Sequence, residues 1–535
     1  ERLVSLSETH LMAIRFSVTP LNFAGRMTIR SGLDAAYGVA ADQDPDDPRA
    51  GHLSISEALE QVACRHDGTQ MSWLHRIAGS QQLIASGCVH STQGTIQDGE
   101  YSGLIYQDIS ADCEAGQDLV VEKVIAYHDG LQAADALATS LGNAPDFDAL
   151  AQSQASELSA FWQRVDIGIE GDSTIEQGMR FNLYQIFQSA GRDGKRAIGA
   201  KGLSGPGYDG HYFWDTEIYI IPFFVYTQPA IARALLAYRC HILDDARTRA
   251  RQMSHKRGAL YAWRTIGGEE CSAFFPAGTA QYHINAAIAY ALRQYLLATD
   301  DWDFMVKQGA EMLFETARIW ADIGHFSAAK GGQFCINEVT GPDEYSAMVD
   351  NNLYTNAMAQ MHLRFAAEAA ERFAREDAQN YAKLADTLSF DEAEIAHWRE
   401  AAEKMYLPYD DSLGIHPQDD GFLSKPVWDF ANTPAENHPL LMHYHPLVIY
   451  RHQVLKQADV VLAMALLPER FTPEQRKRNL DFYGPLTTHD STLSTCIYGI
   501  ESARSGLMDS AYDFFLETAR MDLDNRHHNT EYGLH

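Results

Sequence analysis

The chain has 535 residues, with 42 Lys and Arg against 72 Asp and Glu, so its formal net charge is −30. Apolar residues make up 46% and charged residues 21%, which is typical of a globular protein and excludes a disordered or fibrous one. The acidic balance argues against a nucleic-acid partner, because phosphate backbones are bound by clustered basic side chains. The longest apolar runs, Ile218–Tyr226 and Val460–Leu467, are much shorter than the ~20 residues that cross a bilayer, so we expect no membrane partner.

The cysteines indicate a reducing compartment. Seven of them are scattered along the chain, and no two form a C-x-x-C unit. An odd, scattered set favours reduced thiols and a cytoplasmic location. Pairs of histidines such as His443 and His445 lack a third ligand at metal-binding spacing, so we expect no metal site.

Residues 1–128 are predicted to form part of an antiparallel β-sandwich. Short alternating runs at regular spacing are typical of this fold, and they occur at Ala13–Val18, Gly25–Arg30, Thr69–His75, Gln81–Cys88, Gly103–Ile109 and Asp118–Tyr127. Residues 129–165 are Ala-rich and polar, which indicates a helical linker interrupted at Gly142–Pro145.

Residues 166–535 are predicted to be mainly helical. Apolar residues recur at helical spacing, and helices are expected at 173–190, 228–253, 279–298, 302–323, 352–376, 391–406, 449–466, 473–482, 491–505 and 508–520. Long connections rich in Gly, Pro and aromatic residues separate them, and such loops commonly carry chemistry. Paired helices with large loops at one end favour an (α/α)6 toroid barrel.

The segment Gly202–Glu217 combines glycines, aromatic residues and carboxylates. Trp214 offers a flat apolar surface to a pyranose ring, and the adjacent Asp215 offers an acceptor for sugar hydroxyls. The alternative is a core tryptophan followed by a helix-capping aspartate.

A second candidate is Glu344, in Gly341-Pro-Asp-Glu-Tyr345. A carboxyl group held after a tight turn and partly removed from water has a raised pKa, which suits a general acid. The neighbouring Asp343 could add to this effect by repulsion. The alternative is an ordinary acidic turn.

Two further segments carry polar groups at helix starts. The segment 487–494 contains His489, Ser491 and Thr492, and hydroxyls at a helix N-terminus suit an anion; the alternative is a plain N-cap. Lys456 and Gln457 precede an apolar helical run and could contact a polar ligand, although a surface lysine explains the same pattern. Arg264 and Glu270 lie in the loop 258–278, which could select the substrate or only pack helices together.

Six segments in the same order resemble glycoside hydrolase family 65, the inverting α-glucoside phosphorylases with a minority of hydrolases. The matching segments are Thr19–Phe23 with Arg30–Asp34, Gly210–Glu217, Gly278–Asn285, Val339–Tyr345 with Val349–Asn352, Lys456–Val460 and Thr488–Ser494. Any one match is weak, but six in family order are specific.

The resemblance implies a β-sandwich, a helical linker, an (α/α)6 catalytic barrel and a closing C-terminal segment. Relative to that plan, the chain starts inside the sandwich and stops at Gly533-Leu-His535, so we expect the closing segment to be missing. By analogy with relatives, we also expect that the protein can form a homodimer.

The resemblance also implies roles for single residues. Glu344 matches the general acid, Trp214, Asp215, Lys456 and Gln457 match the residues that hold glucose, and His489, Ser491, Thr492 and His535 match the phosphate site. The expected reaction is phosphorolysis of an α-linked glucose disaccharide to β-glucose 1-phosphate, with phosphate as co-substrate and no cofactor.

The residues leave other functions open. An inverting hydrolase needs a second carboxylate as base, whereas phosphate is already a nucleophile. Asp490 could act as that base, so an α-glucoside hydrolase is the second hypothesis, and a non-catalytic glucan-binding protein is the third. The Arg264–Pro276 loop is more similar to kojibiose- or trehalose-type members than to maltose-type members.

Overall fold

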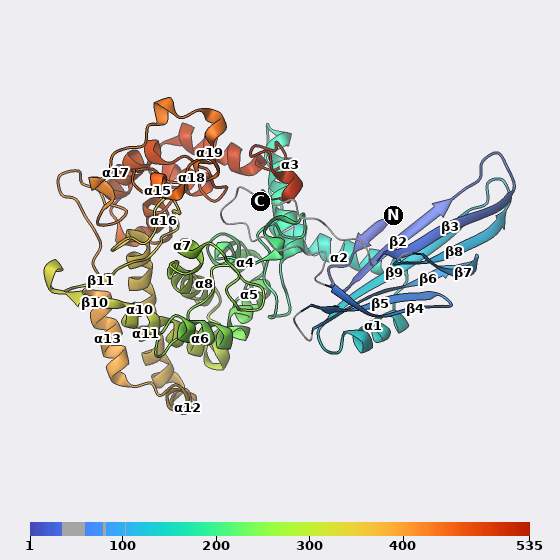
Figure 1. The fold of residues 1–535 in the computed structure, drawn as a ribbon, viewed down its shortest axis with the longest axis horizontal. Coiled ribbons are helices and arrows are strands. Elements are labelled where there is room, and N and C mark those ends of the chain that lie inside the picture. The colour runs from blue at the N-terminus through green and yellow to red at the C-terminus, as the bar shows by residue number, and fades with distance from the viewer. Residues whose placement is uncertain (35–58, 79–81, 102, 535) are drawn as a thin grey trace. The chain divides into compact units, whose positions relative to one another are not determined.

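The computed structural model describes residues 1–34, 59–78, 82–101 and 103–534 (Figure 1). The chain divides into two compact units, one ending at Asp166 and the other beginning at Ile167. Within the described residues, no helix has both the length and the apolar character that a membrane crossing requires.

The described residues of the first unit form two antiparallel sheets. One has six strands in the order β1-β2-β9-β6-β5-β4, and the other has three in the order β3-β8-β7. The strands are β1 (Arg2–Val4), β2 (Leu11–Val18), β3 (Gly25–Asp34), β4 (Leu59–Asp67), β5 (Gln70–Ile77), β6 (Leu83–Thr92), β7 (Thr95–Tyr101), β8 (Leu104–Cys113) and β9 (Leu119–Asp129).

Alternation along the strands places apolar side chains on both faces of the large sheet. Leu11 and Ala13 of β2 pack with α1 (Ala133–Gly142) and α2 (Phe147–Val165). Met12 and Ile14 pack on the opposite side, in a cluster that contains Ile105 of the small sheet. The predicted sandwich fold and the helical segment that follows it are therefore confirmed.

The second unit is mainly helical, as predicted. Its helices are α3 (Ser173–Ser189), α4 (Ile221–Thr227), α5 (Pro229–His241), α6 (Leu243–Gln252), α7 (Phe275–Gly278), α8 (His283–Thr299), α9 (Trp302–Phe304), α10 (Ala310–Ile323), α11 (Leu353–Glu376), α12 (Ala378–Leu388), α13 (Glu392–Glu403), α14 (Leu440–His443), α15 (Pro446–Ile449), α16 (Val460–Leu466), α17 (Pro473–Tyr483), α18 (Thr495–Arg504) and α19 (Met508–Arg520). Helices α4, α8, α11, α16 and α18 pack successively against one another, which is consistent with the inner ring of an (α/α) barrel.

The structure differs from the predicted helices in several places, and α4 was not predicted at all. The helix expected over 491–505 begins only at Thr495. The helix expected over 449–466 covers only α16, because Leu455 pairs with Thr487 in an extended bridge. The helix expected over 228–253 is divided at Ile242 into α5 and α6. Helix α12 was not predicted. It is an amphipathic surface helix in which only Leu388 is buried, so the pattern of apolar residues in its sequence is weak.

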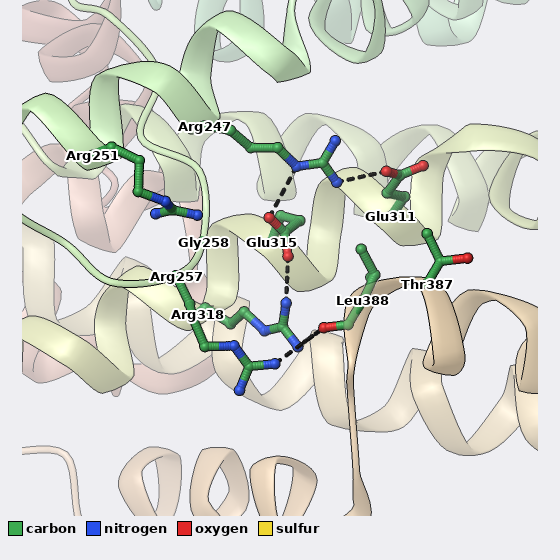
Figure 2. A pocket seen from close by; sticks show the side chains of 9 residues that line it. All are labelled: Arg247, Arg251, Arg257, Gly258, Glu311, Glu315, Arg318, Thr387 and Leu388. Carbon is green, nitrogen blue, oxygen red and sulfur yellow. Dashed lines mark hydrogen bonds and ion pairs between the residues drawn. The ribbon is translucent and has the colours of Figure 1, made fainter.

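A cavity of about 350 Å³ lies between α6, α10 and the end of α12 (Figure 2). Arg247 bonds Glu311 and Glu315, and Glu315 also bonds Arg318. The charges of Arg247 and Arg318 are thus largely balanced by carboxylates, and the ion pairs of Arg247 join α6 to α10. The cavity lining, as far as the structure describes it, contains none of the predicted site residues.

A buried ion pair holds the segment that carries Trp214 and Asp215. Arg239 on α5 donates to both oxygens of Glu217, from Nε at 2.7 Å and from Nη2 at 2.9 Å. Both side chains are only 1% exposed. Glu217 lies in a π-helical turn, Thr216–Ile220, directly after Asp215, so this pair fixes where the turn begins.

We predict that Arg239→Met destabilises the protein by about 3–5 kcal/mol, because it leaves the Glu217 carboxylate buried and unpaired. Chemical denaturation followed by circular dichroism measures this change. Arg233→Met, on the same helix, is the matched control, since the Arg233–Asp301 pair is partly exposed and is worth about 0–1 kcal/mol. Equal effects of the two substitutions would contradict the prediction.

Candidate active site

Glu344 lies in a buried turn that follows the hairpin of β10 (Gly324–Ser327) and β11 (Gln333–Ile336). Its Oε2 accepts a hydrogen bond from Lys456 Nζ at 2.5 Å, and its Oε1 accepts one from Gln281 Nε2 at 3.3 Å. The turn requires Gly341, because a Cβ there would lie 2.3 Å from Asp459 Oδ2. The carboxyl group is therefore held in one place by donors from two other segments.

Two fully buried aspartates brace the turn. Asp343 accepts hydrogen bonds from the backbone N–H of Lys456 at 2.7 Å and from Gln418 Nε2 at 2.9 Å. Burial raises the pKa of Asp343 to about 6, although these hydrogen bonds oppose the shift. Burial and the nearby Asp343 also raise the pKa of Asp459 well above its usual range. Asp459 accepts from Asn352 Nδ2 at 3.1 Å, so both aspartates serve to position the turn.

A polar chain connects Glu344 to Trp214. Gln281, which donates to Glu344, has its Oε1 2.9 Å from His283 Nε2. Burial lowers the pKa of His283 to about 3, so its ring is neutral and donates to Gln281. The His283 ring packs edge-on against Trp214, with centroids 4.9 Å apart. Trp214 is only 4% exposed, so most of its indole is packed inside the protein.

Asp215 and Lys456 belong to the same site as Glu344. Asp215 is half-buried, and burial together with the charges of Glu217 and Glu344 raises its pKa to about 6, while Lys456 opposes the shift. Gln457 is buried and donates from Nε2 to the carbonyl of Pro342 at 2.5 Å. Gln457 thus also supports the turn that carries Glu344.

The loop that carries His489 lies beside Lys456. The backbone N–H of Thr488 donates to Leu455 O at 2.8 Å, which joins the two segments directly. His489 has a positive φ of 57°, and its Nδ1 lies 2.8 Å from Ser494 Oγ. Burial lowers the pKa of His489 to about 4, so the ring is neutral.

The remaining residues of this loop are partly open to solvent. Ser491 Oγ accepts from the backbone N–H of Leu493 at 3.3 Å, and Thr492 is half-buried. Both precede α18 by one turn. His535 lies outside the described residues, and Leu534 is held by a 2.7 Å hydrogen bond from its N–H to Ser204 Oγ.

Tyr345 joins the Glu344 turn to the His489 loop. Its hydroxyl donates to Asp490 Oδ2 at 2.5 Å. The same oxygen accepts from the backbone N–H of Leu440 at 2.9 Å, and Oδ1 lies 3.0 Å from His438 Nδ1. Since Tyr345 follows Glu344 and Asp490 follows His489, the structure brings the predicted acid and the predicted anion loop together.

Arg264 and Glu270 organise the neighbouring loop. Glu270 accepts from the backbone N–H groups of Trp263 at 2.8 Å and Ser272 at 3.0 Å, and burial raises its pKa. Arg264 donates to Asp209 Oδ2 at 2.8 Å. This ion pair fastens the loop to the segment that carries Trp214 and Asp215.

Sequence reasoning missed several residues of the site. Gln281 and His283 stood in a matched segment but received no role, and Tyr345 and Asp459 were likewise unassigned. Their contacts join segments as much as 145 residues apart, and no local pattern carries that information. In the sequence, the adjacent carboxylates Asp343 and Glu344 pointed toward this network.

Comparison with known proteins identifies the family. Residues 180–535 match the model of the glycosyl hydrolase family 65 central catalytic domain, and residues 1–161 match the N-terminal domain of the same family. The α,α-trehalose phosphorylase of Thermoanaerobacter brockii is 44% identical over all of this chain and 70% of its own length. The kojibiose phosphorylase of Halothermothrix orenii is 31% identical over all of this chain and 71% of its own length.

A solved structure supports the same assignment. A kojibiose phosphorylase candidate from the human microbiome superposes with a TM-score of 0.89 at 26% identity, over all of this chain and 70% of that chain. The expected family, fold class and enzyme class are therefore confirmed, and the chain belongs to glycoside hydrolase family 65, among its phosphorylases.

Proposed function

We propose that this enzyme catalyses inverting phosphorolysis of an α-linked glucose disaccharide, releasing β-glucose 1-phosphate and a free sugar. The observation that carries the proposal is the joining of the Glu344 turn to the His489 loop through Tyr345 and Asp490. This arrangement supports a proton donor and an anion site that act on one pyranose ring. The phosphorylase activity named for the relatives supports the same chemistry.

Glu344 is the proposed general acid. In the reaction its proton passes to the glycosidic oxygen as the bond from that oxygen to the anomeric carbon breaks. Without substrate, Lys456 Nζ holds the carboxyl group as an ion pair.

Four residues are proposed to hold the glucose and four to hold phosphate. Trp214 and Asp215 form one wall of the glucose site, and Lys456 and Gln457 form another. His489, Ser491 and Thr492, with His535, are proposed to hold phosphate, whose oxygen attacks the anomeric carbon on the face opposite the departing oxygen. Phosphate is itself the nucleophile, so the reaction needs no cofactor beyond this co-substrate.

The proposed substrate is trehalose, with kojibiose as the second candidate. Identity is higher to the trehalose phosphorylase (44%) than to the kojibiose phosphorylase (31%). The loop of Arg264 and Glu270 is the proposed acceptor side. A reducing compartment such as the cytoplasm suits the seven free cysteines, and a homodimer stays a prediction.

The hydrolase alternative requires Asp490 to act as a base. Both of its oxygens already accept hydrogen bonds from Tyr345, Leu440 and His438. A carboxylate held by three donors is poorly placed to take a proton from water, so the contacts favour phosphorolysis. The non-catalytic alternative has no support from the named relatives, which are enzymes.

Phosphate dependence is the first prediction. Incubation with trehalose should yield glucose and β-glucose 1-phosphate only when inorganic phosphate is present, because phosphate is the proposed nucleophile. The same assay with kojibiose ranks the two substrates, and ³¹P NMR identifies the anomer. Glucose release at the same rate without phosphate would refute the proposal.

The second prediction concerns the acid. Glu344→Gln should lower kcat on the disaccharide by about 10²–10⁴-fold, the usual contribution of a general acid. Phosphorolysis of α-glucosyl fluoride should survive, because fluoride leaves without a proton. Glu338→Gln, an exposed glutamate six residues earlier, is the control. If Glu344→Gln lowered kcat equally on the disaccharide and on α-glucosyl fluoride, Glu344 would not be the general acid.

The third prediction separates phosphorylase from hydrolase. Asp490→Asn keeps the shape of the side chain but weakens its bond with Tyr345, so phosphorolysis should fall only about tenfold, which corresponds to ~1.4 kcal/mol for one charge-assisted hydrogen bond. Steady-state assays with and without phosphate measure the change. Complete loss of turnover with an unchanged melting temperature would favour Asp490 as a catalytic base.

A further inference from the structure

Gln281 is a buried neighbour of the proposed acid. It lies between α7 and α8, and its Nε2 donates to Glu344 Oε1 at 3.3 Å. A glutamine amide carries a donor and an acceptor on the same carbon, so a half-turn about its last bond would place the oxygen against Glu344 instead. Whether Gln281 donates to the acid or accepts from it therefore depends on what binds the other side of the amide.

His283 binds the other side of the amide. Its Nε2 lies 2.9 Å from Gln281 Oε1, and its fully buried ring is neutral, because burial lowers its pKa to about 3. A neutral ring has one N–H group, and among the described residues Nδ1 has no hydrogen-bond partner. Orphaned N–H groups are rarer in protein interiors than unused lone pairs. The N–H of His283 is therefore at Nε2 and donates to Gln281 Oε1, so the NH2 group of Gln281 faces Glu344.

Hydrogen bonds on two sides fix the segment that carries both residues. The backbone N–H of Thr340, four residues before Glu344, donates to Ala280 O at 3.0 Å. The Tyr282 hydroxyl lies 2.9 Å from His255 Nε2, and His255 Nδ1 donates to Asp322 Oδ2 on α10 at 2.6 Å. The segment 280–283 is thus held against both the turn of the acid and a helix of the barrel.

The orientation of this amide matters to a general acid. The acid must transfer its proton to the glycosidic oxygen, and a carbonyl oxygen beside Glu344 Oε1 would bind that proton in a hydrogen bond and keep it from the substrate. An NH2 group at the same place cannot accept a proton. It also donates to the carboxylate that remains when the proton leaves, which stabilises the charge that develops in the transition state.

We propose that Gln281 and His283 are positioning residues for the acid. His283 orients the Gln281 amide so that it donates to Glu344 Oε1, and the proton of the acid stays available to the glycosidic oxygen. The inference rests on the proposed role of Glu344, because both residues act through its carboxyl group. It leaves the proposed glucose and phosphate sites unchanged.

Two substrates test the role of Gln281. The quantity measured is the ratio of kcat on the disaccharide, which needs the acid, to kcat on α-glucosyl fluoride, which does not. Both values come from one preparation, so the ratio is independent of the folded fraction. Gln281→Leu removes the donor at similar size and should lower the ratio about tenfold, the effect of one hydrogen bond, while the KM for phosphate stays within twofold. A ratio within twofold of the wild-type value overturns the inference.

A pair of variants tests whether His283 orients the amide. The amide nitrogen of a glutamine can take the place of imidazole Nε2, so His283→Gln keeps a donor and should keep the ratio within threefold of the wild-type value. His283→Met has no donor and should lower the ratio as much as Gln281→Leu does. The double variant Gln281→Leu/His283→Met should match Gln281→Leu alone, because His283 acts only through Gln281. Equal ratios in His283→Gln and His283→Met, or multiplied losses in the double variant, would overturn the inference.

A buried glutamine outside the site supplies the matched control. Gln360 on α11 donates from Nε2 to Ala402 O at 2.7 Å, and Gln360→Leu should lower the melting temperature without changing the ratio. An equal fall of the ratio in Gln360→Leu would show general loosening and overturn the inference. If the wild type released glucose without phosphate, the proposed phosphorolysis would fail, whereas the same ratio measured for hydrolysis would still decide whether Gln281 and His283 position the acid.

Discussion

The arrangement of the site depends on the hydrogen bond from the Tyr345 hydroxyl to Asp490. It spans 145 residues of sequence and joins the turn that carries Glu344 to the loop that carries His489. The N–H of Leu440 shares the Asp490 carboxylate, and the N–H of Leu441 donates to the Tyr345 oxygen at 3.2 Å. Each charge-assisted hydrogen bond to the Asp490 carboxylate contributes about 1.5–3 kcal/mol to stability. Its loss costs more when one partner is left buried without a hydrogen bond. The two segments that the chemistry needs are thereby kept in a fixed relation before any substrate is bound.

Several ionisable groups near the Tyr345–Asp490 hydrogen bond have shifted pKa values because they are buried. Asp343, Asp459 and Asp215 all have raised pKa values because they are withdrawn from water, and His283 and His489 have lowered ones for the same reason. The two histidines are therefore neutral at neutral pH and add no positive charge to a protein of net charge −30. Lys456, which pairs with Glu344, places a positive charge directly beside the proposed acid.

Much of the fold and of the candidate site can be predicted from the sequence, and each wrong prediction has a physical reason. Alternation in β2 and helical periodicity in α11 are local patterns, so the sandwich and most helices could be predicted, and Gly341-Pro342 marked a tight turn correctly. The helix expected over 449–466 was wrong before Val460, because a tertiary bridge from Leu455 to Thr487 overrides the local preference. The partners of Glu344, namely Gln281 and Lys456, come from distant segments of the chain. Contacts of this kind are set by the packing of the whole unit.

The most direct test of the account is a crystal structure of the enzyme with β-glucose 1-phosphate bound. The account predicts that one glucose ring lies between Trp214, Asp215 and Lys456, with its phosphate on the side of His489, Ser491 and Thr492 and with Glu344 on the opposite face of the anomeric carbon. A phosphate bound in a different cavity from the glucose ring, or on the same face as Glu344, would contradict it.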